Sequence, residues 1–249
     1  MSPNTQNAVI LLAGTGSRLE PLTKTTHKSL IEVGGLTILD RQIDQFTEHG
    51  IKNFHLVVGY KKEEVQQHVL NKKKAGAEFR FCINPLYEET NTAYSLMLAL
   101  KGLEGSFILI DGDVVLDHPL AGTLCAATKE NILLADTNRD ALNHEAVKFM
   151  VNDINEITKI GKAIPLSEAA GESIGVGLYQ KDWACVLRDY LETAMKEKNN
   201  WHWYYEDAIQ NIMQKQCAPS PLKIQPVNDL RWVEIDDHAD LKKARAIFA

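Results

Sequence analysis

Near its start the chain reads Ala8-Val9-Ile10-Leu11-Leu12-Ala13-Gly14-Thr15-Gly16-Ser17-Arg18-Leu19, an apolar run joined to a glycine turn and an arginine. Lys28 follows within the segment His27-Lys28-Ser29-Leu30. The apolar run predicts a buried strand. The glycines allow backbone N–H groups to approach an anion closely, and Arg18 and Lys28 add positive charge. These residues therefore predict a polyphosphate-binding loop at the carboxyl end of a strand.

The loop matches neither of two common phosphate-binding patterns. A P-loop requires Gly-Lys-Ser or Gly-Lys-Thr at its second glycine, and a dinucleotide-binding turn requires a third glycine where Leu19 stands. A glycine pair after a strand is, by itself, a common way to reverse the chain. The specific signal is the whole pattern from Leu11 to Leu30.

Strand and helix patterns alternate through the first half of the chain. Apolar runs typical of strands lie at residues 9–13, 53–58, 78–83 and 106–110, and helices are expected at 37–49, 62–74 and 92–100. This alternation predicts an α/β fold with a mostly parallel, twisted sheet flanked by helices on both faces. Such sheets bind ligands at the carboxyl ends of their strands. The glycine loop and Asp113 are therefore expected to converge.

The pattern changes after Asp113. Residues 147–151 and 154–160 predict an antiparallel hairpin around Asn152-Asp153, and residues 174–179 return to a core strand. Further strands are expected at 132–135, 222–226 and 232–235, and further helices at 120–127, 182–197, 203–214 and 240–248. No low-complexity linker interrupts the sequence. We therefore expect a single domain over residues 1–249, with a small antiparallel portion in its second half.

Composition and charge exclude several classes of protein. Lys and Arg number 27 against 33 Asp and Glu, a net charge of −6, whereas nonspecific nucleic-acid binders usually carry a basic surface. No apolar run approaches the roughly 20 residues that span a membrane, and residues 1–7 lack the apolar core of a signal peptide. The cysteines have no metal-like spacing, so we expect reduced thiols and a cytoplasmic protein. They are Cys82, Cys125, Cys185 and Cys217.

The pattern Leu12-Ala13-Gly14-x-Gly16-x-Arg18-Leu19-x-Pro21-Leu22-Thr23, followed by Lys28, resembles the signature of the nucleotidyltransferases that make sugar nucleotides and CDP-alcohols. Its ending, His27-Lys28-Ser29-Leu30, is most similar to the phosphocholine cytidylyltransferase-like branch. The resemblance implies a Rossmann-like sheet of the nucleotide-diphospho-sugar transferase type. It also implies a nucleotide-binding half at residues 8–130 and an acceptor-binding half at residues 131–249.

The resemblance further implies a Mg²⁺ cofactor held by Asp113 and Asp236, which match the family's metal aspartates. Each follows an apolar strand, Asp236 coming after Arg231-Trp232-Val233-Glu234-Ile235. A hard cation bound by carboxylates, waters and phosphate oxygens suits nucleotidyl transfer. Two alternatives stay open. Asp111 is the other candidate ligand in its motif, and Asp236 is equally placed to N-cap the last helix, a role for which Asp237 competes.

The nucleotide contacts also follow from the resemblance. Lys28 would hold the acceptor phosphate beside the α-phosphate, and Arg18 would hold the leaving pyrophosphate, both through charge and not through proton transfer. The alternative for each is a surface salt bridge. Backbone or hydroxyl contacts to phosphates are expected from Thr15, Gly16 and Ser17, base and ribose contacts from Leu12, Ala13 and Gly14, and pyrimidine and ribose contacts from Asn84, Asn91, Thr92 and Ser95. Asn91 and Thr92 are equally consistent with N-caps of the helix that follows.

Acceptor recognition is expected in the second half. Glu172 lies in Gly171-Glu172-Ser173-Ile174-Gly175-Val176, where many family members contact an acceptor group. The segment Trp201-His202-Trp203-Tyr204-Tyr205-Glu206-Asp207 offers aromatics and carboxylates suited to an ammonium group, with Trp203, Tyr204, Tyr205 and Glu206 as candidates. The alternative is an aromatic helix start packed on the sheet, with Glu206 and Asp207 accepting from N–H groups of the first turn. We expect one or two of the aromatics and one carboxylate to face the ligand. The hairpin edge adds His144, Glu145 and Lys148.

The expected reaction is CMP transfer from CTP to a small phosphorylated or phosphonate amino-alcohol of the phosphocholine or 2-aminoethylphosphonate type, with release of pyrophosphate. The aromatic and acidic segment favours such an acceptor over a neutral sugar phosphate. Alternatives are a sugar-1-phosphate or inositol-phosphate nucleotidyltransferase, and a nucleotide sensor without catalytic activity on the same fold. The expected partners are CTP and the acceptor, with no nucleic acid, no membrane insertion and a possible homodimer.

Overall fold

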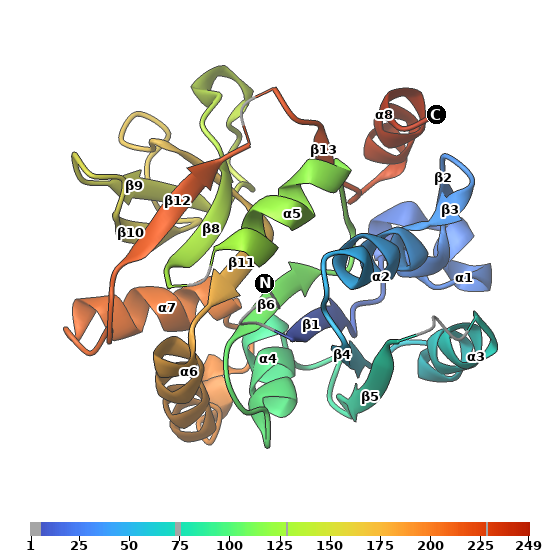
Figure 1. The fold of residues 1–249 in the computed structure, drawn as a ribbon, viewed down its shortest axis with the longest axis horizontal. Coiled ribbons are helices and arrows are strands. Elements are labelled where there is room, and N and C mark those ends of the chain that lie inside the picture. Colours follow the sequence, from blue (N-terminus) through green and yellow to red (C-terminus); the bar gives the residue numbers. More distant parts are fainter. Residues whose placement is uncertain (1–5, 73–75, 128, 228) are drawn as a thin grey trace.

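The computed structural model describes residues 6–72, 76–127, 129–227 and 229–249, and residues 1–5, on which the signal-peptide expectation partly rests, lie outside them (Figure 1). Its centre is a sheet of nine strands. Four strands are parallel neighbours in the order β6, β1, β4, β5. Their bounds are Phe107–Asp111, Asn7–Leu12, Asn53–Val58 and Glu78–Ile83. This order confirms the expected parallel sheet, with β1 at its middle.

Both faces of the parallel sheet are covered by helices, as predicted (Figure 1). Val9 and Leu11 of β1 belong to a core cluster on one face, and Ala8, Ile10 and Leu12 belong to a second cluster on the other face. The first cluster is completed by α4 (Thr92–Leu100), α6 (Lys181–Ala194) and α7 (Tyr205–Gln214), and the second by α2 (Ile38–Glu48), α3 (Lys62–Lys72) and α5 (His118–Ala126). Side chains therefore alternate between two apolar cores, which explains why β1 is a continuous apolar run.

The predicted helices lie within a few residues of the observed ones, and the short α1 was not predicted. The predicted end of α3 at residue 74 lies outside the described residues. The largest difference is at α6, which ends at Ala194 and not at 197, and α7 starts at Tyr205, so that Trp203 and Tyr204 lie ahead of the helix. The helices are α1 Leu22–Thr25, α2 Ile38–Glu48, α3 Lys62–Lys72, α4 Thr92–Leu100, α5 His118–Ala126, α6 Lys181–Ala194, α7 Tyr205–Gln214 and α8 His238–Ile247. Among the described residues, none of these helices is long and apolar enough to cross a membrane.

The second half extends the sheet with antiparallel strands. Strand β11, Gly171–Tyr179, pairs antiparallel with β6 and carries the sheet outward to β8, Asn131–Asp136, and to β9, Lys148–Val151. Strand β10, Ile157–Gly161, forms the predicted hairpin with β9, and β12, Leu222–Pro226, pairs with β8. The expectation of a small antiparallel portion in this half is confirmed.

A short antiparallel pair was not predicted and joins the two halves. Strand β7, Val114–Leu116, pairs with β13, Trp232–Glu234. A second pair, β2 Glu32–Val33 with β3 Leu36–Thr37, packs against α8 (Figure 1). Because Asp113 precedes β7 and Asp236 follows β13, the β7–β13 pairing brings these two aspartates to one end of the sheet.

Candidate active site

The glycine loop folds back on the carboxyl end of β1. Gly16 has a φ of 62°, and its carbonyl accepts a hydrogen bond from Thr23 Oγ1 at 3.0 Å. A Cβ at this position would lie 3.0 Å from Thr23 Cγ2 and 3.2 Å from the Cβ of Lys28. Glycine is therefore needed both for the left-handed backbone and for the close approach of the Lys28 side chain.

The Gly16→Ala variant is expected to lose about 1–2 kcal/mol of unfolding free energy, since an L side chain is strained in the left-handed region and would also push against Lys28. Gly14→Ala is the matched control, because a Cβ at Gly14 meets no atom within 4 Å and its φ is not positive. Denaturant unfolding of both variants checks this. A loss in Gly14→Ala equal to that in Gly16→Ala would contradict it.

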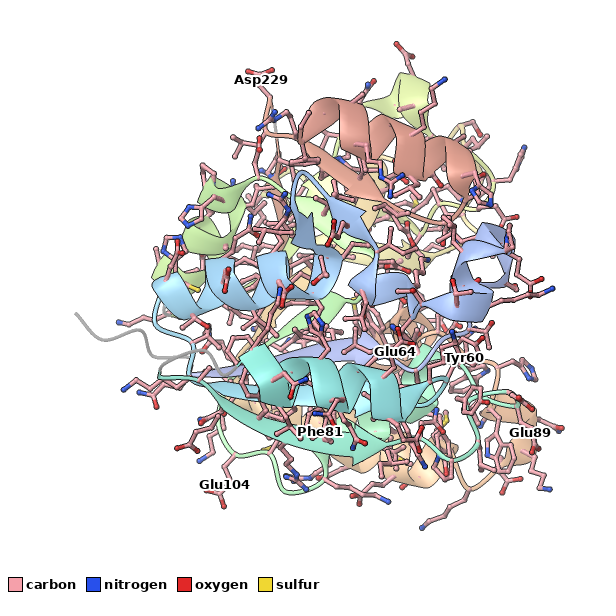
Figure 2. The ribbon with its side chains drawn as sticks, turned by 90° about the vertical axis from the view of Figure 1, so that its right-hand side faces the viewer. Tyr60, Glu64, Phe81, Glu89, Glu104 and Asp229 are labelled. Atoms are coloured by element: carbon pink, nitrogen blue, oxygen red, sulfur yellow. The ribbon has the colours of Figure 1, made fainter. Side chains whose placement is uncertain are left out.

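His27 anchors the backbone segment that carries Lys28 to the end of β1. Its ring is buried, with Nε2 3.0 Å from the Leu12 carbonyl oxygen and Nδ1 3.2 Å from the Ser29 amide. The neutral ring with a proton on Nε2 satisfies both contacts. Burial lowers the pKa of His27 to about 4. The backbone N–H of His27 donates to the Glu64 carboxylate at 3.2 Å, and Figure 2 shows Glu64 beside Tyr60 near the loop.

His27 is expected to make the fold sensitive to mild acid. Its pKa is lower in the folded than in the unfolded state, so the stabilisation is present above pH 6.5 and is lost as the pH falls from 6.5 towards 4. The full effect is on the order of 3 kcal/mol. Unfolding free energies measured at pH 7 and pH 5 should therefore differ less in His27→Gln than in the unaltered protein. An equal difference in both would rule out this role.

Lys28 lies between the two predicted metal aspartates. Its Nζ is 2.8 Å from Asp113 Oδ2 and 3.1 Å from Asp236 Oδ1, and the Arg18 guanidinium is 2.9 Å from Asp236 Oδ2. Burial by itself would lower the pKa of Lys28, but the attraction of Asp113 and Asp236 outweighs it and raises the pKa. Lys28 therefore remains an ammonium and cannot serve as a general base at neutral pH. The Lys28 side chain is only 12% exposed, so its pair is not a surface salt bridge, whereas Arg18 is 62% exposed and its ion pair with Asp236 matches the surface salt bridge that was its alternative.

Glu234 joins this cluster and was missed by the sequence analysis. Ligand oxygens of Asp113, Glu234 and Asp236 all lie within 4.8 Å of one another. Glu234 is an exposed residue, but its carboxyl group lies in the cleft, where desolvation and repulsion from Asp113 and Asp236 raise its pKa to about 8. The β-strand period gives a signal that was available, because positions 234 and 236 share one side of an extended chain.

The acidic cluster fits a hard divalent cation. Its donors are carboxylate oxygens, the ligands that Mg²⁺ prefers, and Asp113 Oδ1 is buried without a hydrogen-bond partner among the described residues. The N-cap of α8 is Asp237 and not Asp236, because Asp237 Oδ1 accepts hydrogen bonds from the amides of Ala239 and Asp240. The Asp236 side chain instead contacts Lys28 and Arg18.

Asp111 lies behind the cluster and faces another element. Its Oδ2 accepts a hydrogen bond from Tyr205 Oη at 3.3 Å, and a Cβ at Gly175 would come within 2.4 Å of the same oxygen. Burial, followed by repulsion from Glu206 and Asp113, raises the pKa of Asp111. This side chain therefore ties the end of β6 to the start of α7, and it is outside the group of oxygens around Lys28.

The polar cluster after β5 is organised by its own hydrogen bonds. Asn84 is buried and donates to Thr90 Oγ1 at 3.0 Å and to Ser95 Oγ at 3.1 Å. Asn91 caps α4, since its side chain accepts from the Thr92 amide. Thr92 Oγ1 accepts from the Tyr205 amide at 3.0 Å, so α4 is joined to the acceptor-side segment. Asn91 is thus the N-cap of α4, which is one of the two roles expected for it.

A cleft of about 650 Å³ brings most of the predicted residues together. Its walls include predicted residues from both halves, namely Ala13, Gly14, Arg18, Asn84, Asn91, Thr92, Ser95, Asp113, Glu172, Tyr204, Tyr205, Glu206 and Asp236. The described residues Leu12, Thr15, Gly16, Ser17, Lys28 and Trp203 are not among those that line it. Tyr87, which was not predicted, also lines the cleft and packs against Gly59 at the end of β4. No sequence signal singled it out.

The acceptor-side aromatics point in different directions. Tyr205 is buried, with its hydroxyl on Asp111, whereas Tyr204 is 36% exposed. Trp203 packs against the core and lines a neighbouring cavity of about 350 Å³ that Tyr204 and Glu206 share with the cleft. Within the described part of the chain, Tyr204 is thus the exposed aromatic of the predicted set in the cleft. The four candidates do not surround one point.

Two carboxyl groups on this side have raised pKa values. Burial and repulsion from Asp136, its partner across the β11–β8 pair, raise the pKa of Glu172 to about 7. Burial raises the pKa of Glu206 to about 7 as well. Each carboxyl group would ionise more readily beside a cation, so both favour a positively charged ligand group in this part of the cleft.

The chain is similar to known proteins along almost its whole length. The family model "Nucleotidyl transferase" matches residues 7–246. The choline-phosphate cytidylyltransferase of Streptococcus pneumoniae is 29% identical over 240 residues, which cover 96% of this chain and 97% of the relative. The 2-aminoethylphosphonate cytidylyltransferase of Lancefieldella rimae is 27% identical over 243 residues, with 94% and 90% covered.

A bifunctional GlmU protein of Methanococcus aeolicus is 28% identical over 212 residues, and this match covers 84% of the chain and 47% of the relative's length. Among solved structures, a CTP:phosphocholine cytidylyltransferase from Streptococcus pneumoniae superposes with a TM-score of 0.80 at 23% identity, covering 98% of this chain and 99% of that one. This likeness confirms the predicted nucleotide-diphospho-sugar transferase type of fold. Because the family model spans almost the whole chain, the protein belongs to the nucleotidyl transferase family.

Proposed function

We propose that this nucleotidyltransferase moves CMP from CTP to a small amino-bearing phosphate or phosphonate and releases pyrophosphate. The observation that carries the proposal is the Lys28 ammonium, held within 3.1 Å of Asp113 and Asp236 beneath the glycine loop. The cleft that Asp113 and Asp236 line also contains Glu172 and Glu206, carboxyl groups suited to an amino group. The names of the choline-phosphate and 2-aminoethylphosphonate cytidylyltransferase relatives support CTP as donor and an acceptor of this type.

In the proposed reaction an oxygen of the acceptor phosphate or phosphonate attacks the α-phosphorus of CTP. A new P–O bond forms, the bond from the α-phosphorus to the oxygen that bridges to the β-phosphorus breaks, and pyrophosphate leaves with that oxygen. Arg18 and Lys28 would exchange their carboxylate partners for phosphate oxygens. Lys28 would offset the repulsion between the two reacting anions, and Arg18 would stabilise the charge on the leaving group.

Asp113, Glu234 and Asp236 are proposed to hold the Mg²⁺ ion. When bound, such an ion neutralises charge that develops on the α-phosphate and on pyrophosphate. The chain's own contribution is orientation: His27 anchors the backbone beside Lys28, Gly16 leaves room for the Lys28 side chain, and the β7–β13 pair brings the two aspartates together. The side chains of the proposed site are therefore held in position before the substrates arrive.

Recognition of the rest of each substrate is assigned to the two halves of the chain. We propose that the nucleotide base and ribose lie along Leu12, Ala13, Gly14 and the Asn84–Ser95 region, with phosphates at Thr15, Gly16 and Ser17. The acceptor would lie between Glu172 and Glu206. Residues 8–130 and 131–249 would then contribute to one site within a single domain. Four free cysteines are consistent with the proposed cytoplasmic location.

The test is pyrophosphate release over a panel of nucleoside triphosphates and acceptors, with Mg²⁺ and with a chelator. We expect release with CTP and with 2-aminoethylphosphonate, phosphoethanolamine or a related amino-bearing acceptor, and none with the chelator. Release with UTP or dTTP and a sugar-1-phosphate, or with CTP and inositol phosphate, would replace this proposal. No release from any pair would favour a nucleotide sensor.

A further inference from the structure

On the acceptor side, the exposed ring of Tyr204 is already in contact with the ammonium group of Lys162. Lys162, just after β10, places its Nζ 4.4 Å from the ring centroid of Tyr204 and 3.3 Å from the Tyr204 hydroxyl oxygen. Lys162, Tyr204 and Glu206 all line both the cleft and the smaller neighbouring cavity. The cation–π position on Tyr204 is thus filled by a residue of the protein itself.

This placement disfavours a quaternary ammonium group on the acceptor. Such a group carries no N–H donors and depends on open aromatic faces. Of the other aromatics in the segment, Tyr205 is buried with its hydroxyl group on Asp111, Trp201 packs edge-on against Tyr94, and Trp203 lines the smaller cavity but not the cleft. A second cation at Tyr204 would have to displace Lys162 or lie beside a like charge, which is unfavourable.

Lys162 is paired only loosely. Among the described residues its ion-pair partner is Glu145, at 3.8 Å, and the Glu145 side chain is 83% exposed. Exposed pairs at this distance contribute little and exchange readily for a better partner. The other lysine of this hairpin is unavailable for a ligand: Lys148 is buried, and its Nζ donates to the carbonyls of Ala146 at 2.9 Å and His144 at 3.3 Å. Lys162 is therefore the hairpin cation that faces the cleft.

Groups of opposite charge line the acceptor side of the cleft. Lys162 and Glu206 line both the cleft and the smaller cavity, and Glu172 lines the cleft. A ligand with only an amino group can pair with the carboxyl groups of Glu172 and Glu206, but its positive charge is repelled by Lys162. A ligand with both an amino group and a carboxylate satisfies both kinds of partner.

We propose that the acceptor is zwitterionic beyond its phosphate or phosphonate, with an amino group facing Glu172 and Glu206 and a carboxylate bound by Lys162. This inference rests on the proposed cytidylyl transfer and narrows its acceptor to a phosphorylated or phosphonylated amino acid. Lys162 would then be a specificity-determining residue. Tyr204 would orient its ammonium towards the acceptor through the ring face and the hydroxyl group.

The test uses two pairs of acceptors that differ only in a carboxylate. They are phosphoserine against phosphoethanolamine, and 2-amino-3-phosphonopropionate against 2-aminoethylphosphonate, with phosphocholine as the quaternary probe. We expect kcat/KM with CTP and Mg²⁺ to be at least about 10-fold higher for one carboxylated member than for its partner, and lowest for phosphocholine. Lys162→Met should reduce that ratio towards one, mainly through KM. Lys159→Met, an exposed lysine earlier on β10, should leave the ratio unchanged.

The same acceptors are also titrated by calorimetry into protein saturated with a non-hydrolysable CTP analogue, so that binding is measured without turnover. If no acceptor is turned over, the proposed function fails, whereas a binding preference for carboxylated probes that is lost in Lys162→Met still supports this inference. Equal or better use and binding of phosphoethanolamine, 2-aminoethylphosphonate or phosphocholine would overturn it. So would a preference for the carboxylate that persists in Lys162→Met.

Discussion

Lys28→Gln is expected to lower kcat/KM for CMP transfer by about 10²–10³-fold, the usual effect of removing one positioned charge from a polyanionic transition state. The Lys28 side chain is only 12% exposed and bridges Asp113 and Asp236. Its charge is therefore fixed at the point where the acceptor and the α-phosphate would meet. Because this charge acts most strongly in the transition state, kcat should fall more than KM for CTP rises. Steady-state kinetics with CTP and the best acceptor measures both.

Lys24→Gln is the matched control for Lys28→Gln. Lys24 lies four residues earlier, in α1, pairs with Glu20 at 2.9 Å and has a side chain that is 66% exposed. This variant should keep activity within about twofold, since an exposed pair of this kind contributes little. A similar loss in both variants would show that the loop needs net positive charge and not an ammonium at position 28, which would contradict the proposed role.

Asp236→Asn is expected to lower kcat by at least about 100-fold and to raise the Mg²⁺ concentration needed for half-maximal activity. The change keeps the shape of the side chain but removes one of three carboxylates around the proposed metal. It also weakens the contacts with Lys28 and Arg18, which hold these cations in place. Activity measured across a Mg²⁺ titration separates the two effects, because saturating metal restores only the part that depends on metal affinity.

The neighbouring residue provides the control for Asp236→Asn. Asp237 is exposed, and its side chain caps α8 through the amides of Ala239 and Asp240. Asp237→Ala should therefore lower Tm by about 2–4 °C, as expected for loss of an N-cap, and leave the Mg²⁺ dependence unchanged. A Mg²⁺ dependence that changed in Asp237→Ala but not in Asp236→Asn would contradict the proposed role of Asp236 as a metal ligand.

Local sequence carried the information for most elements. The alternation of cores along β1 requires apolar side chains on both faces, so the run from Ala8 to Leu12 could be recognised as a buried parallel strand. Asp113 was predictable because a carboxylate directly after a buried strand needs solvent, a partner or a ligand. For the same reason Asp236 was a candidate, although the sequence left its capping alternative open.

Long-range pairing was not predictable in the same way. Strand β7 has three residues, and its partner β13 lies more than a hundred residues away, so no local period marks the pairing. Side-chain direction was equally hidden at the start of α7. The composition of the aromatic segment indicated an ammonium site. The direction of the Tyr205 side chain, however, depends on its hydrogen bond to Asp111, and the face of the Tyr204 ring is covered by Lys162. Both partners come from distant elements.

In the proposed reaction an acceptor oxygen attacks the α-phosphorus of CTP in the presence of a divalent cation. An acceptor phosphonate whose oxygens are all labelled with ¹⁸O tests this, with mass spectrometry of the products. We predict that all of the label appears in a CMP-linked product, that pyrophosphate carries none, and that a chelator prevents the reaction. Labelled oxygen in pyrophosphate, a pyrophosphorylated acceptor with free CMP, or full activity with the chelator would contradict the claim.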